Sequence, residues 1–396
     1  MMESKIDETN LLKREVQKRF GKKLNSSFEC VNLSDHINKL TGSYISPQTL
    51  RRFFGFIDDN TNPSPYTISI LLKYCSRGSL EELRLIEQNR QNRQINPETI
   101  FTIKEFYNIE LTPEFDFNFQ KACGNIAKLI TSDSNLLDEL SGHLCKNPVS
   151  QIFFFERHPF IDGLCNGYSQ YVEAYIEEKN TNEARMFGYC LIHLGLILSQ
   201  RNKEADKLLK KINNIEANAS IHPFVQARKI MANLLNADIK SDKFTLQYWM
   251  ELAFQEEKKQ ARNPVKEAYF PFYQFILADA FNLTGQFDNA LDMIHIAESD
   301  YKKIDKAPIE EGYYHALNLI KAIALFNIDK LQESKQLLRE VNNEELVFSS
   351  KKYFLLQRLH LELSMAKDQS TTKRNKLIDS INLLVKETGF SCFTVR

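Results

Sequence analysis

The sequence holds few of the residues that make tight turns. It has 13 glycines and 11 prolines among 396 residues, about half the usual share of the two. Because a β-sandwich or a β-barrel needs many such turns, this shortage argues against either fold. Intrinsic disorder is disfavoured as well, since 28 phenylalanines and 15 tyrosines can bury a large core. The composition therefore favours an all-α fold.

Long hydrophobic runs and paired cysteines are also missing. The most apolar segment, Cys190–Leu198, contains His193 and is shorter than a membrane-spanning helix requires. The first residues carry neither the basic nor the apolar segment of a secretory signal. The 7 cysteines are dispersed and form no CxxC pair, which is typical of free thiols in a reducing compartment. We therefore expect a cytoplasmic protein with no membrane partner.

The signatures of common enzymes and cofactor sites are not found either. The 8 histidines form no HxxxH or HExxH pair, and no GxGxxG, GxxxxGK[ST] or GxSxG string occurs. Cys145 or Cys165 could pair with His143 or His158, but a buried structural cysteine is the simpler interpretation. We likewise interpret Glu156, in the cluster that contains His158, as half of an ion pair. The sequence predicts no enzymatic activity, cofactor or metal.

Positive charge is concentrated near the N-terminus although the whole chain is neutral. The 51 basic residues balance 51 acidic ones. Between Leu11 and Phe54, however, nine lysines and arginines face only three acidic residues. A basic module on an acidic body is typical of a nucleic-acid binder with a second, non-binding domain. A solvated face of ordinary helices would show the same excess, so charge alone leaves both interpretations open.

The spacing of apolar residues and the residues that begin or end helices divide the chain into three parts. These are a helical module at 1–94, a helical connector at 95–184 and a set of helical repeats at 185–396. In the module, helices are predicted at Leu11–Phe20, at Leu33–Thr41 with Ser34 as its cap, and at Pro47–Phe54. A fourth is predicted at Thr67–Tyr74, and the polar run 88–97 is a candidate linker. The connector is predicted to contain helices at 115–130, 136–144 and 161–176, and the aromatic run 152–155 is too short to assign.

A motif in the module resembles the second half of a bacterial helix-turn-helix. The string runs from Gly42 to Phe53 and reads G-x-x-x-S-x-x-T-L-R-R-F. In that family a helix ends at glycine, and after a turn a serine caps the recognition helix. The turn in this chain is about two residues longer than the commonest form. The block from Leu33 to about Leu83 also resembles N-terminal modules that precede helical repeats in Bacteroidota proteins.

The polar side of this third helix suggests DNA contacts. Glutamine can bond adenine and arginine can bond guanine in the major groove, so we expect Gln48, Arg51 and Arg52 to read bases. Ser46 and Thr49 lie near the helix N-terminus, where phosphate contacts are favourable. Four basic residues of the first helix and its end are expected to contact phosphates without sequence preference: Lys18, Arg19, Lys22 and Lys23. The alternative is an exposed polar face with no role in DNA binding.

The third part contains a repeat that resembles the tetratricopeptide family. The best copy is formed by Leu277, Ala278, Phe281, Gly285, Phe287, Ala290, Ile294 and Ala297. Small residues at three of these positions admit a neighbouring helix, and large ones fill the gaps between helices. Weaker copies around Ala205 and Ser334 share the register, and a degenerate copy is expected at Val225–Ala253. We therefore predict an α-solenoid of helical hairpins.

Together the two ends resemble bacterial regulators that join a helix-turn-helix to a tetratricopeptide array and sense short peptides. By analogy, the first helix of the best repeat would line a concave peptide-binding face. Its expected outward positions are Phe272, Phe275, Asp279 and Asn282.

The sequence thus predicts an all-α protein with a small helix-turn-helix-like domain followed by a tetratricopeptide-like α-solenoid. Its predicted function is that of a DNA-binding transcriptional regulator. The repeat domain is expected to form a homodimer, to bind a peptide or protein, or to do both. The alternative function is that of a helical-repeat adaptor or scaffold that binds proteins and no nucleic acid.

Overall fold

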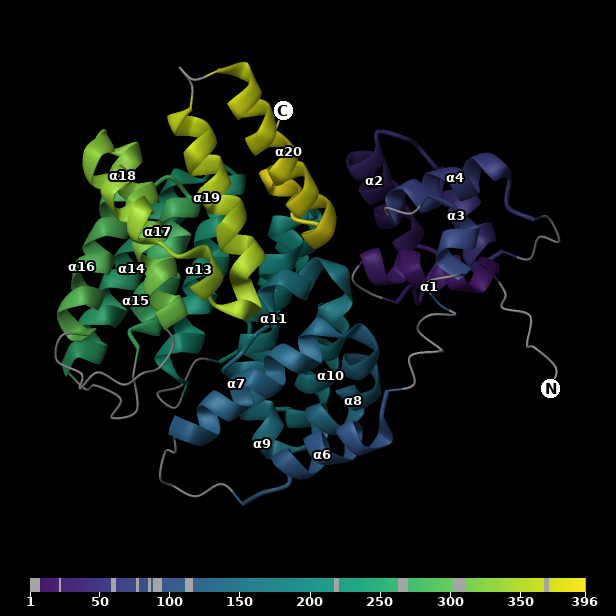
Figure 1. Cartoon of the computed structure of the whole chain (residues 1–396), viewed down its shortest axis with the longest axis horizontal. Coiled ribbons are helices and arrows are strands. Elements are labelled where there is room, and N and C mark those ends of the chain that lie inside the picture. The colour runs from purple at the N-terminus through teal and green to yellow at the C-terminus, as the bar shows by residue number, and fades with distance from the viewer. Residues whose placement is uncertain are drawn as a thin grey trace.

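The protein is helical throughout the part of the chain that its structure describes. The computed structural model describes residues 8–20, 23–57, 62–75, 78–84, 87, 95–110, 117–216, 221–262, 270–301, 311–366 and 370–395. Within these ranges no residue lies in a β-strand, and Figure 1 shows helices packed against helices. The prediction of an all-α fold is confirmed. The candidate linker lies outside the described residues from 88 to 94.

The N-terminal module has a hydrophobic core of its own. Its helices are α1 (Glu8–Phe20), α2 (Glu29–Thr41), α3 (Pro47–Phe54) and α4 (Pro65–Tyr74). Leu12, Val16 and Phe20 recur every four residues on α1 and are buried, as their spacing predicts. They pack with Leu50 of α3 and Leu71 of α4 in one cluster. This cluster is separate from the core of the remaining chain.

One predicted cap in the module is wrong. Ser34 was expected to begin the second helix, but α2 already begins at Glu29. Cys30 and Leu33 are fully buried, so the apolar face of the helix starts about one turn before Ser34. The Ser34 hydroxyl is buried and donates to the carbonyl oxygen of Ile45 at 2.5 Å. Ser34 therefore ties α2 to the turn before α3 instead of capping a helix.

The described residues of the second part of the chain form four regular α-helices, with short and irregular helices between the last two. They are α6 (Pro97–Tyr107), α7 (Phe117–Ser132), α8 (Ser134–Lys146), α9 (Pro148–Ser150), the π-helix η1 (Gln151–Glu156), the 3₁₀-helix η2 (Ile161–Gly163), the π-helix η3 (Leu164–Tyr168) and α10 (Ser169–Lys179). The helix predicted at 161–176 is regular only from Ser169, because Asn166 and Gly167 leave helical geometry. Gly167 has a φ of +98°, a value that favours glycine. The bend directs η3 toward α1, with which it is in contact.

The third part consists of consecutive helical hairpins. They pair α11 (Asn182–Leu198) with α12 (Asn202–Asn213), α13 (Pro223–Ile239) with α14 (Lys243–Arg262), α15 (Phe272–Leu283) with α16 (Phe287–Tyr301), α17 (Glu311–Asn327) with α18 (Leu331–Glu340), and α19 (Lys351–Met365) with α20 (Thr371–Thr388). The first helices of successive hairpins pack side by side. Ala278, Ala290 and Ala297 are completely buried, as close helix packing requires. The expected copy at Val225–Ala253 coincides with the hairpin α13–α14.

The last hairpin returns to the middle of the chain. The short helices η4 (Asn343–Glu345) and η5 (Phe348–Ser350) precede α19, and η6 (Ser391–Phe393) follows α20. The Asp162 carboxylate of η2 accepts hydrogen bonds from the backbone N–H groups of Lys352 and Tyr353, at 2.8 and 2.9 Å. A single core therefore extends from Ile103 to Phe390, so the second and third parts of the chain share it.

The interior of the hairpin array contains a histidine that destabilises it. His193 on α11 is fully buried, and neither ring nitrogen has a hydrogen-bond partner among the described residues. Burial lowers the pKa of His193 from 6.5 to about 4, so the fold holds the neutral ring. We expect His193→Leu to raise the free energy of unfolding by about 1–3 kcal/mol at pH 7.5, because it removes two unsatisfied buried polar atoms.

The pH dependence of this substitution has a definite sign. As the pH falls from 6.5 toward 4, the unfolded chain binds a proton at His193 before the folded chain does, and stability is lost. At pH 5 the variant should therefore gain about 2 kcal/mol more than at pH 7.5. Urea titrations at both pH values measure this difference. The exposed His295→Leu is the control and should change stability by less than about 0.5 kcal/mol. An equal gain at the two pH values would contradict the prediction.

Candidate nucleic-acid interface

The short helix α3 follows a turn whose geometry the sequence specifies. Gly42 ends α2 with a φ of +67°, which an L-residue with a side chain rarely adopts. Ser46 has extended backbone, and its hydroxyl oxygen accepts a hydrogen bond from the N–H of Thr49 at 3.1 Å. Pro47 occupies the first helical position. The predicted serine cap and proline start of α3 are thus confirmed.

The residues expected to read bases have different surroundings on α3. Leu50 and Phe53 are buried in the module, and Gln48 and Arg52 are exposed. Arg51 is half-buried, and its Nε donates to the carbonyl oxygen of Ser27 at 3.0 Å. The side chain of Arg51 therefore holds the segment before α2.

Ser46 and Thr49 are half-buried, with their hydroxyl oxygens 2.9 Å apart. They lie on the same short turn and helix as Gln48 and Arg52. The structure therefore brings the predicted α3 residues together, with Gln48 and Arg52 as the two whose side chains are exposed.

The basic residues at the end of α1 are not brought to α3. The Nη1 of Arg19 donates to Asn166 Oδ1 at 2.8 Å, and a Cβ added to Gly167 would lie 3.1 Å from Lys18 Cγ. Both side chains therefore face η3, which belongs to the part of the chain after residue 94. We call this part the body. Lys23 is exposed just after α1, and Lys22 lies outside the described residues.

Another basic residue of α1 lies beside α3 instead. The Nζ of Lys13 is 5.7 Å from the centre of the Phe53 ring. Five positions separate Lys13 from Lys18, which places them about 140° apart around a helix. A helical wheel of α1 separates Lys13 from Lys18, and the contact with Phe53 places Lys13 beside the motif.

The residues expected on a concave peptide-binding face are mostly inside the protein. Phe275, Asp279 and Asn282 are buried, and Phe272 is half-buried. The expectation that these positions face outward is wrong for the three buried side chains, because α17 and α19 cover this side of α15.

Two of these side chains are bonded within the array. Asp279 accepts hydrogen bonds from the Tyr353 hydroxyl at 2.7 Å and from Gln357 Nε2 at 3.0 Å. Asn282 Nδ2 donates to the carbonyl oxygen of Ile320 at 2.7 Å. Burial raises the pKa of Asp279 to about 6, and the two side-chain hydrogen bonds oppose that shift. These contacts join Asn282 to α17 of the next hairpin and Asp279 to α19 of the hairpin after it.

The cysteines considered for nucleophilic chemistry are buried and protonated at neutral pH. The Sγ of Cys145 donates to the carbonyl oxygen of Tyr171, and that of Cys165 to the carbonyl oxygen of Gly195. Burial raises the pKa of each thiol to about 12. Neither thiol is therefore activated as a nucleophile.

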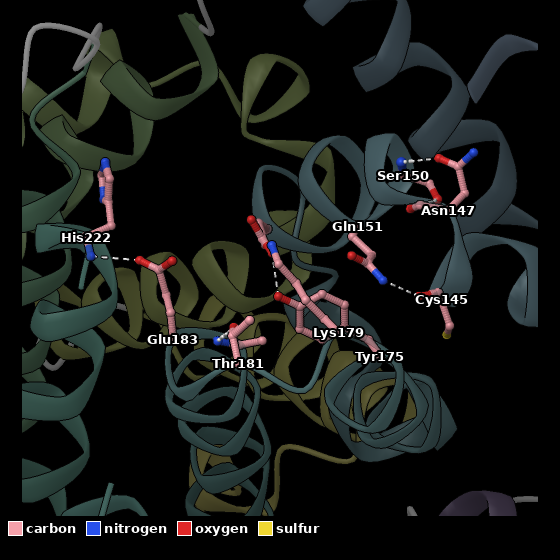
Figure 2. A network of polar contacts seen from close by, with 11 residues as sticks. Cys145, Asn147, Ser150, Gln151, Tyr175, Lys179, Thr181, Glu183 and His222 are labelled. Carbon is pink, nitrogen blue, oxygen red and sulfur yellow. Dashed lines mark hydrogen bonds and ion pairs between the residues drawn. The ribbon is translucent and has the colours of Figure 1, made fainter. Parts of the chain in front are cut away.

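The polar contacts around η1 are those of a structural network. The Glu156 carboxylate accepts hydrogen bonds from the Tyr175 hydroxyl and the Lys179 ammonium, as the ion-pair interpretation predicts. Figure 2 shows nearby contacts of the same kind: Gln151 reaches the carbonyl oxygen of Cys145, and Glu183 reaches the backbone N–H of His222. The Gln151 contact joins the start of η1 to the end of α8, and the Glu183 contact joins the start of α11 to the start of α13.

Residues of the body hold the module in place. The Arg201 guanidinium, at the start of α12, lies 4.1 Å from the centre of the Phe20 ring and donates to the carbonyl oxygen of Phe20. It also forms two hydrogen bonds with the Glu204 carboxylate, at 2.8 and 2.6 Å. On α2, Lys39 donates to the carbonyl oxygen of Gln200 at 2.9 Å. The module thus docks through α1 and α2.

No helix among the described residues is both long enough and apolar enough to span a bilayer. Comparison with known proteins gives no match: no family model, curated protein or solved structure is significantly similar to this chain.

Proposed function

We propose that the protein is a DNA-binding transcriptional regulator with a helix-turn-helix-like module and a tetratricopeptide-like array. The observation that carries the proposal is α3, a serine-capped helix that exposes Gln48 and Arg52 after a left-handed glycine turn. With its N-terminal end in the major groove, such a helix offers an amide for adenine and a guanidinium for guanine. The excess of basic residues around it favours phosphate contacts.

The array supplies a second role in this proposal. Its helical hairpins would join two copies of the chain, so that two modules reach half-sites about one turn of DNA apart. A peptide or protein bound to the array would change this spacing and so regulate binding. Because Arg19 is bonded to the body, α3 and Lys13 are the better candidates for the interface than the C-terminal end of α1.

DNA selection tests the proposal directly. The full chain is used to select duplexes from a random pool at low salt, and the selected duplex is then titrated with variants. We expect Arg52→Ala to weaken binding by about 5–150-fold and to relax the preference at one base pair. The control Arg84→Ala also removes an exposed arginine from the module and should change affinity by less than about threefold.

Two results would contradict the proposal. One is the absence of any duplex binding by the full chain at low salt. The other is binding without sequence preference that Arg52→Ala and Arg84→Ala weaken equally, because this would reduce the module to a phosphate binder. Arg51 is not substituted in this test, since its contact with Ser27 would confuse lost recognition with lost structure.

One observation favours the adaptor function as a second candidate. On α14, Phe244 is 86% exposed and Tyr248 is 55% exposed, and the two lie one helical turn apart on the same face. Exposed aromatic residues of this kind are enriched in protein–protein interfaces. If the full chain binds no DNA, this pair is where a protein partner is expected to dock.

A further inference from the structure

The N-terminal module and the body enclose a pocket where they meet, which we call the junction pocket. It has a volume of about 410 Å³, which is within the range of sites that hold small organic molecules. Its walls come from α1 and α2 of the module and from η3, α10, α11 and α12 of the body. Helix α3, every residue of which is described, contributes nothing to these walls. The junction pocket is therefore distinct from the proposed DNA-binding surface.

One part of the wall is apolar. Phe20 contributes from the module, and Leu164, Ile192, Leu196 and Leu208 contribute from the body. Phe20 is held in position between the Arg201 guanidinium, 4.1 Å away, and the His36 ring, 5.7 Å away. Ile192, Leu196 and Leu208 are half-buried and so offer a ligand an aliphatic surface, and the fully buried Phe20 lies behind it.

The charge of the wall favours an anion. Its charged side chains among the described residues are Arg19, Arg201, Lys207, Lys211, Glu29, Glu173 and Glu204. Two of the glutamates are bonded within the protein: Glu204 to Arg201, and Glu29 to the backbone N–H groups of Asn25 and Ser26. Lys207 and Lys211 are exposed members of the lining, and Lys207 Nζ lies 5.5 Å from the centre of the Phe28 ring. The wall thus holds four cationic and three anionic side chains, a net charge of +1, and two of its cations are exposed.

Two buried polar atoms of the wall have no partner. His36 is 95% buried, and its Nδ1 is bonded to the Tyr74 hydroxyl at 2.7 Å, but its Nε2 has no hydrogen-bond partner among the described residues. The Nε of Arg19 is likewise buried without one. Burial lowers the pKa of His36, and the charges of Arg201, Arg19 and Lys39 lower it further. A neutral His36 whose Nδ1 accepts from Tyr74 presents an Nε2–H donor, and Arg19 presents a second donor.

We propose that the junction pocket binds a small organic carboxylate with an apolar body. The carboxylate lies toward Arg19 and His36, whose unpartnered donors it satisfies. The apolar body lies against Ile192, Leu196 and Leu208 of α11 and α12. Because the ligand touches both walls, it fixes the module against the body. Its binding is measured without DNA, so the test is independent of the proposed function.

The test uses 2-naphthoate as the probe and 2-naphthamide as its uncharged counterpart. Each is titrated into the full chain, and binding is followed by the fluorescence of the naphthalene ring and by calorimetry. We expect one site per chain and binding of 2-naphthoate that is about tenfold or more tighter than that of the amide. Amide hydrogen exchange should slow in α2 and in α12 together when 2-naphthoate is bound.

Matched variants locate the site. Asn32→Trp places an indole from α2 in the pocket and should abolish binding, whereas Asn38→Trp, at an exposed position of the same helix outside the pocket, should not. The double variant Lys207→Gln/Lys211→Gln should weaken binding of 2-naphthoate and leave that of the amide unchanged. Its control is Lys203→Gln/Lys210→Gln, which makes the same charge change on exposed positions of α12 that do not line the pocket.

Four results would overturn the proposal, and three of them come from the amide and the variants. They are equal affinity for the acid and the amide, unchanged 2-naphthoate binding in folded Asn32→Trp, and equal loss of binding in the two lysine double variants. Circular dichroism of each variant establishes that it is folded. Absence of any 2-naphthoate binding by the wild-type chain would also overturn the proposal.

Discussion

Asp162→Ala is expected to lower the free energy of unfolding by about 2–4 kcal/mol. The Asp162 carboxylate is buried, and it accepts hydrogen bonds from two backbone N–H groups in the first turn of α19. Alanine would leave these donors without their acceptor inside the protein. Because Asp162 lies 190 residues before Lys352, the effect should appear in the last hairpin as well as in η2. Urea titration measures the loss. Compared with the wild type, amide hydrogen exchange should be accelerated more in α19 than in α13.

Asp162→Asn is the matched control for this prediction. Its amide oxygen keeps one acceptor for the first turn of α19, and the substitution removes a carboxylate that burial disfavours. Burial raises the pKa of Asp162 to about 6, against the two backbone hydrogen bonds that lower it. The loss in stability should therefore be about 1–2 kcal/mol, about half that of Asp162→Ala, because one of the two N–H groups still loses its acceptor. Equal losses for alanine and asparagine would mean that the hydrogen bonds to α19 contribute little.

Arg201→Ala is expected to detach the N-terminal module from the body. The Arg201 side chain is only 9% exposed, and its partner Glu204 is 15% exposed. Removing one member of a pair this buried costs about 3–5 kcal/mol, because the other charge is left without compensation. The variant also loses the stacking on Phe20 and the hydrogen bond to its carbonyl oxygen. Small-angle scattering should show an increased radius of gyration, and hydrogen exchange should accelerate at the C-terminal end of α1.

A double-mutant cycle separates the ion pair from the docking contacts. The variant Arg201→Ala/Glu204→Ala removes both charges, so it should recover part of the lost stability. It should not restore the compact shape, because the contacts with Phe20 remain absent. If Arg201→Ala keeps the wild-type radius of gyration, docking of the module does not depend on this arginine.

Features that depend on a few neighbouring residues could be predicted from the sequence. The start of α3 is one example, because Ser46, Pro47 and Thr49 contain the whole cap within four positions. The buried stripe of α1 is another, because its spacing alone determines which face is apolar. The same reasoning failed at Ser34, whose partner Ile45 lies beyond the end of its own helix.

Features that depend on distant packing could not be predicted in this way. The sequence does not reveal that α17 and α19 both cover the side of α15 that carries Asp279. Asp279 and Asn282 were therefore expected on an exposed peptide-binding face, whereas both are buried and hydrogen-bonded. Arg19 was expected to contact DNA because of its charge, but its partner Asn166 lies 147 residues away. The junction pocket has walls from the module and from the body. No local sequence pattern indicates that the module and the body meet there.

The return of the last hairpin to η3 has a consequence for synthesis of the chain. Asn166 donates to the carbonyl oxygen of Glu387, 221 residues later. The described core of the module, in contrast, consists only of residues between Leu11 and Leu83. On the ribosome the module can therefore fold early, because its contacts are local. The body cannot complete its core until α19 and α20 have left the exit tunnel. During that interval the parts of η2 and η3 that α19 and α20 cover in the folded protein stay exposed, so this surface is where a chaperone would be needed most.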